Sequence, residues 1–134
     1  KLPVKLKKLK IKNRYLNYLV IKNKNAVILG KRHEGIWKGL YEFPFIEYSN
    51  KKSDTLVVLS HEWITFFKNT KYEIESVSHQ FIHKLSHQLI FAKFWTVNVK
   101  DFELERYSFI KNFKLKSYPV SRLTDKFLKE YNII

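Results

Sequence analysis

The sequence predicts a single α+β domain in which helices pack against a mixed β-sheet. Short runs rich in β-branched and aromatic residues recur along the chain, and such runs predict strands. Two other segments repeat apolar residues every three or four positions, which predicts helices. The 134 residues are 45% hydrophobic and 16% aromatic, which is enough apolar material for one buried core.

The first part of the chain predicts a hairpin and an irregular loop. Residues 14–21 alternate and form a strand, the polar residues 22–25 form a turn, and residues 26–29 form the partner strand. The glycines that follow supply unusual turns. They are Gly30, Gly35 and Gly39. Residues 41–48 are apolar and extended, with Pro44 at a bend or a sheet edge.

The first helix is expected over residues 56–68. Apolar residues recur there at steps of three and four, and Ser53, Asp54 or Thr55 is suitable as the N-cap. Its predicted core face consists of Leu56, Leu59, Trp63 and Phe67.

The second half predicts a long hairpin and a closing helix. Residues 74–85 and 88–99 are two strand-like runs with a short link, which favours a hairpin. A further strand is expected near residues 106–111. Pro119 precedes a helix with Ser121 near its start. The apolar face of that helix consists of Leu123, Phe127, Leu128 and Tyr131.

The charge is strongly basic. The formal net charge is +14, and the first fourteen residues hold seven positive charges and no acid. Such a surface attracts polyanions, chiefly nucleic acid or an anionic membrane face. The alternative is a solubilising surface, since the chain has 22 Lys against 4 Arg. No apolar stretch is long enough for a membrane span. The absence of Cys excludes disulfides and cysteine-ligated clusters from this chain.

Four segments carry a resemblance to a known family. The stretch Lys31–Pro44, KRHEGIWKGLYEFP, resembles a motif in the C-terminal domain of MutY-type adenine DNA glycosylases. PVKLKK with RYLNYLVI is similar to that family's interdomain connector and first strand. His83–His87 resembles its His-x-Phe-Ser-His loop, and YPVSRLTDKFL resembles its last helix. The four segments occur in the family's order and cover almost the whole chain.

The resemblance implies a connector at residues 1–13 and a Nudix-like C-terminal domain at 14–134, a fragment of a larger protein, as the start at Lys1 also suggests. Nudix hydrolases hold divalent metal against a pyrophosphate with glutamates of one motif, the Nudix box, because hard cations need oxygen ligands. With the first Gly of that box aligned on Ile46, the metal ligands are missing, and a start at Gly39 also fails. The residues at the key positions are Lys52, Ser60, His61, Ile64 and Thr65. We therefore expect no enzyme activity and no cofactor in this domain, with a Nudix pyrophosphohydrolase as the alternative.

Two other groups of polar residues have simpler interpretations. His79, His83 and His87 recur every four residues, which on a helix would suggest a metal face. The flanking pattern is strand-like, so we expect no metal site. Glu42 and Glu47 flank Pro44 and are expected to be solvated edge charges rather than a catalytic pair.

The family's role implies recognition of 8-oxoguanine opposite adenine. In 8-oxoguanine N7 carries a proton and C8 an oxygen, so a reader needs an acceptor for N7–H or a donor for O8. A Ser hydroxyl does either. The resemblance assigns the lesion contact to Ser86 and a base-pair or phosphate contact to His87. Leu85 replaces the family's Phe and is an apolar wedge, while His83 is a hydrogen-bonded support of the loop. Otherwise Ser86 is simply a turn residue.

The same resemblance implies the partners. They are double-stranded DNA containing 8-oxoguanine:adenine and the chain's own N-terminal catalytic domain, which in this family carries the catalytic carboxylates and a 4Fe-4S cluster. We expect a monomer in the bacterial cytoplasm and no membrane contact. A generic basic single-strand-binding module is a further alternative. The expected DNA backbone contacts are Lys5, Lys7, Lys8, Lys10 and Lys84.

Overall fold

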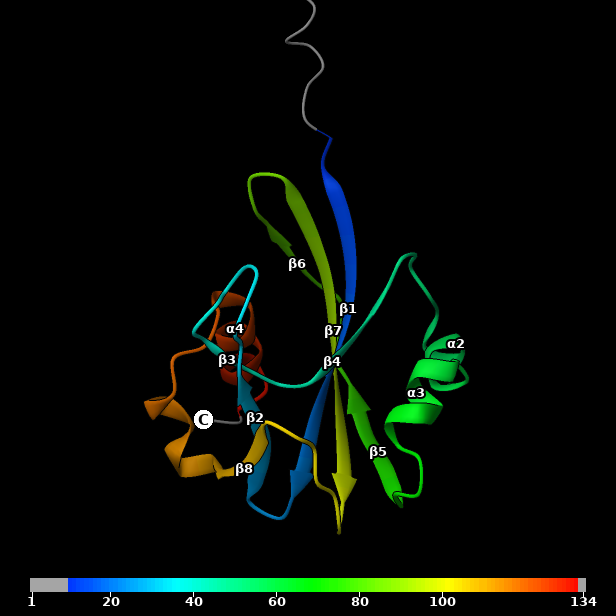
Figure 1. Cartoon of the computed structure of the whole chain (residues 1–134), viewed down its shortest axis with the longest axis vertical. Helices are drawn as coiled ribbons and strands as arrows, with labels where there is room; N and C mark the ends of the chain where they lie inside the picture. The colour runs from blue at the N-terminus through cyan, green and yellow to red at the C-terminus, as the bar shows by residue number, and fades with distance from the viewer. Residues whose placement is uncertain (1–9, 133–134) are drawn as a thin grey trace, which may run out of the picture.

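The computed structural model describes residues 10–132 of the chain, and within them eight strands form one mixed sheet (Figure 1). The strands are β1 (Lys12–Asn23), β2 (Ala26–Lys31), β3 (Tyr41–Glu42), β4 (Phe45–Tyr48), β5 (Tyr72–Val77), β6 (Phe81–Lys84), β7 (Gln88–Val99) and β8 (Tyr107–Lys111). The helices are α2 (Asp54–Val58), α3 (His61–Phe66), the 3₁₀ helix η1 (Asn112–Ser117) and α4 (Arg122–Glu130). Within this part of the chain, none of the helices has the length and apolarity needed to cross a membrane.

The centre of the sheet is the parallel pair β1 and β7. Their register extends from Lys12 opposite Gln88 to Lys22 opposite Asn98. The order along the sheet is β3-β2-β1-β7-β5, while β4, β6 and β8 pair with β1, β7 and β2. All of these other pairs are antiparallel. The expected mixed sheet is therefore confirmed.

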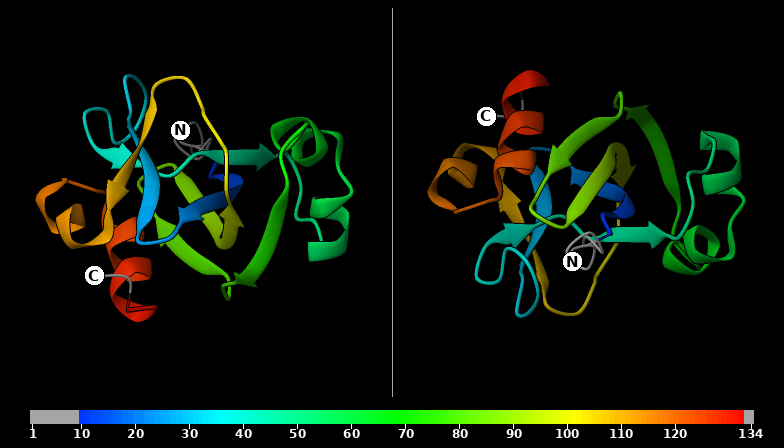
Figure 2. Two further views of the ribbon diagram at one scale, coloured as in Figure 1. Left: turned by 90° about the horizontal axis from the view of Figure 1, so that it is seen from below. Right: turned by 90° about the horizontal axis from the view of Figure 1, so that it is seen from above.

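Both faces of the sheet are covered, because α4 and the α2–α3 pair lie on opposite sides of it (Figure 2). Alternate residues of β1 point to opposite faces. Tyr18 belongs to the core cluster that contains Phe127 of α4, and Leu19 belongs to the cluster that contains Trp63 of α3. Burial on both faces explains why residues 18–21 of β1 are a continuous apolar run rather than the alternation expected from the sequence.

The helix expected over residues 56–68 is two short helices. Ser53, one of the three N-cap candidates, is the N-cap of α2. Ser60 has an extended backbone and is the N-cap of a second helix, α3. The break rotates the apolar face. Leu56 and Leu59 are 56% and 65% exposed, and Val57 is buried in their place. The predicted core face is therefore wrong at these two leucines and confirmed at Trp63 and Phe67.

The strand expected over residues 74–85 is also interrupted. β5 and β6 both pair with β7 but are separated by a bend at residues 78–80. In the bend, the Ser78 hydroxyl accepts a hydrogen bond from the Phe94 N–H at 2.9 Å. The predicted hairpin between β6 and β7 and the closing helix capped by Ser121 are confirmed.

The glycine-containing loop makes the turns that the sequence predicts. Gly35 and Gly39 have φ of +76° and +89°, a region that other residues rarely adopt. Gly30 has a different role in β2. A Cβ there would lie 2.7 Å from the Tyr107 ring, so the close contact between β2 and β8 requires glycine.

Candidate functional site

The tip of the β6–β7 hairpin presents two exposed polar residues, Ser86 and His87. The Leu85 N–H donates to the Gln88 carbonyl at 2.8 Å and closes the turn. The His87 carbonyl accepts from the Lys12 N–H at 3.0 Å, so the start of β1 is bonded to the tip. Figure 1 shows this hairpin and the beginning of β1 at the same end of the molecule. Three strands therefore support a short polar loop that faces solvent.

Leu85 forms the inner side of the same loop. It is half-buried and packs against the core cluster that contains Phe81 and Ile90. A side chain in this position anchors the turn to the domain through apolar contact. Its expected role as a wedge between bases stays a prediction.

His83 supports the loop through packing. Its ring lies edge-on to Trp37, with ring centroids 5.7 Å apart, rather than in the hydrogen-bonded support expected from the sequence. Desolvation lowers the pKa of His83, and the positive charges of Lys126 and Arg122 lower it further. A neutral ring fits this half-buried position. The contact joins the glycine-containing loop to the hairpin, two segments that the sequence analysis singled out separately.

Trp37 is held firmly in that loop. It has a φ of +64°, and its carbonyl accepts from the Leu40 N–H at 3.0 Å. A bulky side chain rarely occupies this region of φ, so the surrounding structure must hold it there. Trp37 also packs against the core cluster on the α4 side. No local sequence pattern connects this side chain with the hairpin.

Several exposed lysines lie near the tip. Lys84 ends β6, Lys12 begins β1 and Lys10 precedes it, and all three are exposed. Lys5, Lys7 and Lys8, the other expected DNA contacts, lie outside the described residues. The tip is therefore a polar turn with positive charge beside it, which is the arrangement expected for a surface that meets phosphates.

Two ion pairs near the site were missed by sequence reasoning. Arg14 binds both carboxylate oxygens of Glu47, at 2.8 and 2.6 Å, and donates to Gln88 at 3.0 Å. The hydrogen bond from Arg14 lowers the pKa of Glu47. Arg32 pairs with Glu42, whose side chain is only 12% exposed, so the expectation of a solvated charge is wrong there. Burial raises the pKa of Glu42, and Arg32 opposes this rise.

The segment aligned with the Nudix box starts in β4 and continues through a loop into the two short helices α2 and α3, and its metal-ligand positions hold no carboxylate. The aligned positions His61, Ile64 and Thr65 lie on the exposed side of α3. The carboxylate of α2, Asp54, accepts from the Lys93 amine at 2.8 Å. Among residues 10–132, no group of three His, Cys, Asp or Glu side chains is placed to hold a metal ion.

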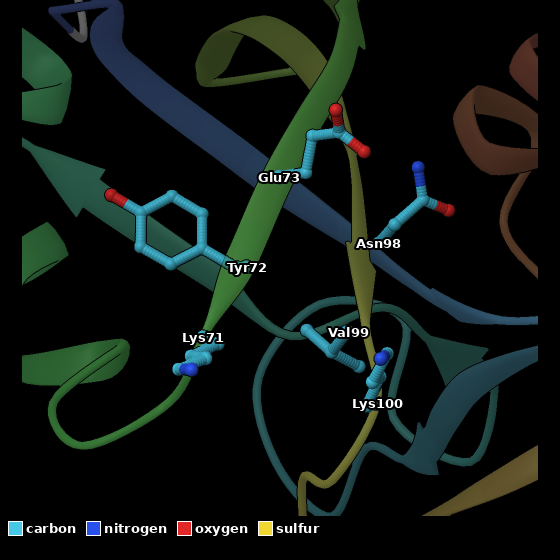
Figure 3. Close-up of a pocket in the computed structure, with 6 residues that line it drawn as sticks. All are labelled: Lys71, Tyr72, Glu73, Asn98, Val99 and Lys100. Atoms are coloured by element: carbon cyan, nitrogen blue, oxygen red, sulfur yellow. The ribbon is translucent and has the colours of Figure 1, made fainter.

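A separate hollow lies at the opposite end of β7 (Figure 3). Glu73 of β5 and Asn98 of β7 are opposite in register and project to one side, while Tyr72 points to the other. Lys71 and Lys100 lie at its edge. This hollow is ten residues along β7 from the hairpin tip, so the two features are distinct.

Comparison with known proteins identifies the family. A family model described as the NUDIX domain matches residues 17–130. The chain belongs to the NUDIX domain family. The matched segment begins within β1 and runs to the end of α4, so it covers nearly all of the described fold. No curated protein sequence significantly matches the chain.

Solved structures agree with this fold. The C-terminal domain of mouse MUTYH, solved in complex with human PCNA, has a TM-score of 0.69 at 15% identity, covering 89% of this chain and 87% of that one. The MutT protein of Methanosarcina mazei Go1 has a TM-score of 0.63 at 15% identity, with coverage of 93% and 96%. A NUDIX hydrolase of Nitrosomonas europaea has a TM-score of 0.64 at 10% identity, with coverage of 90% and 89%. These similarities show the Nudix fold.

Proposed function

We propose that this Nudix domain is the lesion-recognition domain of an adenine DNA glycosylase, which reads 8-oxoguanine opposite a mispaired adenine and clamps the duplex. The observation that carries the proposal is the exposed Ser86–His87 turn, fixed by three strands and flanked by lysines. The motif resemblance of residues 83–87 and 31–44 supports it, and the fold similarity to the MUTYH C-terminal domain is consistent with it.

The chemistry requires only one well-placed hydroxyl. The Ser86 hydroxyl accepts a hydrogen bond from the lesion's N7–H or donates one to its O8. Normal guanine has an N7 acceptor and no O8, so either contact discriminates between the two bases. His87 is exposed next to Ser86, and in this proposal it contacts the base pair or a neighbouring phosphate. A preformed turn makes this contact without ordering a flexible loop at each encounter.

The wider assignment follows from the same proposal. The parent protein removes adenine with an N-terminal catalytic domain that carries a 4Fe-4S cluster, and it acts in the bacterial cytoplasm. This domain then contributes recognition rather than bond cleavage. The basic residues 1–13 form the connector between the two domains.

The test is binding of this chain to duplexes that contain 8-oxoguanine:adenine or guanine:adenine, over a series of salt concentrations. We expect a preference for the lesion that persists as salt weakens the total affinity. Ser86→Ala removes one polar contact worth about 1–3 kcal/mol, so the preference should fall by at least fivefold. Ser108→Ala is the matched control, because Ser108 is an exposed serine in β8.

Three results would contradict the proposal. Equal binding of both duplexes would leave only a basic duplex clamp. Affinity for single strands at least equal to that for duplexes would indicate a generic binding module. Magnesium-dependent release of pyrophosphate from nucleotides would indicate the hydrolase alternative. Such a metal needs several oxygen ligands, whereas α3 has one carboxylate, Glu62, and the Nudix-box positions hold His61, Ile64 and Thr65.

A further inference from the structure

One row of side chains crosses four strands on the sheet face that carries α2 and α3. Tyr15 of β1 is opposite Tyr48 of β4 and Phe91 of β7, and Phe91 is opposite Ile82 of β6. Directly paired residues share a face, so the four side chains form a continuous apolar row. The Tyr15 and Phe91 rings are stacked, with centroids 5.1 Å apart and planes at 12°.

The row becomes steadily more exposed toward the sheet edge. Tyr48 is buried and its hydroxyl lies 2.6 Å from that of Ser60, whereas Tyr15 and Phe91 are half-buried. Ile82 is 54% exposed. The helices α2 and α3 therefore cover one end of the row, and solvent reaches the other end.

Lysines surround the row. Lys51 and Lys52 lie in the loop between β4 and α2, where they line a shallow hollow with Tyr15 and Phe91. The Lys52 amine is 5.4 Å from the centre of the Tyr48 ring. Lys84 lies two residues beyond Ile82 and shares its face. Within residues 10–132, no ion pair involves these three lysines.

We infer that this row and its lysines, here called the lysine-rimmed face, bind the sugar–phosphate strand of DNA that runs away from the hairpin tip. The lysines contact phosphates, and the exposed apolar side chains pack against sugars or bases. The inference rests on the proposed DNA-binding function and extends it to Lys51, Lys52, Ile82 and Phe91, which lie outside the segments that carry the family resemblance.

The spacing supports one continuous surface. Phe91 is three residues beyond Gln88, where β7 begins, and a strand rises about 3.3 Å per residue. The row is therefore about 10 Å from the base of the tip, a length over which one DNA strand presents about three phosphates. The charge favours DNA over a protein partner, since among the described residues Lys51, Lys52 and Lys84 form no ion pair that would neutralise them. The carboxylate of Asp54, two residues after Lys52, pairs with Lys93 instead.

The experiment measures how duplex affinity depends on salt for Lys51→Ala/Lys52→Ala. Each lost phosphate contact lowers the slope of log affinity against log salt by about 0.9, so the double variant should lower it by about 1.8. The matched control is Lys71→Ala/Lys100→Ala, two exposed lysines at the opposite end of the sheet (Figure 3). A slope equal to that of the control would overturn the inference.

A second variant tests the apolar row itself. Ile82→Glu places a negative charge at the exposed end of the row and should weaken duplex binding at low salt. Ile64→Glu is the control, because Ile64 is 57% exposed on α3 and lies outside the row. Equal effects of the two substitutions would also overturn the inference. The same holds if Lys51→Ala/Lys52→Ala keeps the salt slope of the wild type and the lysine-rimmed face binds an apolar protein partner instead of DNA.

These tests separate the inference from the proposed function. Ser86→Ala should change the lesion preference and leave the salt slope unchanged, whereas Lys51→Ala/Lys52→Ala should do the reverse. A reduced slope without any lesion preference in the wild type supports the lysine-rimmed face and contradicts lesion reading. A lesion preference with an unchanged slope in the lysine variant does the opposite.

Discussion

At the scale of single residues, Asn17 is a polar side chain inside the core. It is 8% exposed, and its Oδ1 accepts a hydrogen bond from the indole N–H of Trp95 at 2.9 Å. The bond joins β1 to β7 on the face that carries α3. A buried indole N–H without an acceptor is costly, so this pair stabilises the central strands.

We predict that Asn17→Ala lowers the free energy of unfolding by about 1–3 kcal/mol, because it leaves the Trp95 N–H without its partner. Urea denaturation followed by circular dichroism measures the change. Trp95→Phe should cost less in the Asn17→Ala background than in the wild type, since the unpaired donor is then removed. Strictly additive costs would show that the hydrogen bond contributes nothing.

At the scale of elements, Ser60 determines where one helix ends and the next begins. Its hydroxyl accepts from the Trp63 N–H at 3.3 Å, donates to the Val57 carbonyl at 2.7 Å and lies 2.6 Å from the Tyr48 hydroxyl. The residue thereby links α2, α3 and β4. Ser53 caps α2 in a simpler way, through the exposed Leu56 N–H.

We therefore predict that Ser60→Ala costs more stability than Ser53→Ala. Loss of an N-cap costs about 1 kcal/mol, and Ser60→Ala also removes the partner of the Tyr48 hydroxyl. The midpoints of urea unfolding for the two variants make the comparison. Equal losses would mean that the contact with Tyr48 adds nothing to the cap.

At the scale of the whole molecule, α4 is joined to the sheet by its buried face and by its end. Phe127 stacks on Phe94, with ring centroids 4.3 Å apart. At the end of the helix, Glu130 lies 2.6 Å from Nε2 of His79, in the bend between β5 and β6, and the Tyr131 hydroxyl accepts from the His79 N–H. The C-terminal helix is therefore connected to the edge of the sheet by a titratable pair.

This pair predicts a pH dependence of stability. The hydrogen bond to Glu130 raises the pKa of His79, with a further contribution from the Gln80 carbonyl. The stabilisation is complete below the ordinary histidine pKa of about 6.5 and is lost as the pH rises through the raised value. The effect is small because both side chains are largely exposed.

Unfolding midpoints measured across neutral pH test this prediction. His79→Gln should remove the part of the pH dependence that the pair contributes. The exposed His33 supplies the control, since His33→Gln should retain the dependence of the wild type. An identical pH profile for all three proteins would contradict the role of His79.

The sequence by itself determined the α+β class, the hairpin pairs, the glycine turns and the Ser121 cap, because these depend on residues close together in the chain. It also placed the 83–87 turn at a hairpin tip. The same sequence has no carboxylates at the metal-ligand positions of the Nudix box. Only the tertiary structure decided the break at Ser60, because its hydroxyl is held by Tyr48 of another strand.

The candidate site, too, was determined partly by local sequence and partly by the tertiary structure. The polar turn could be read from local sequence, but its surroundings could not. The parallel register of β1 and β7 places Tyr15 beside Phe91, and chain folding places Trp37 against His83. Long-range register depends on how both faces of the sheet are buried at once, and no local pattern contains that information.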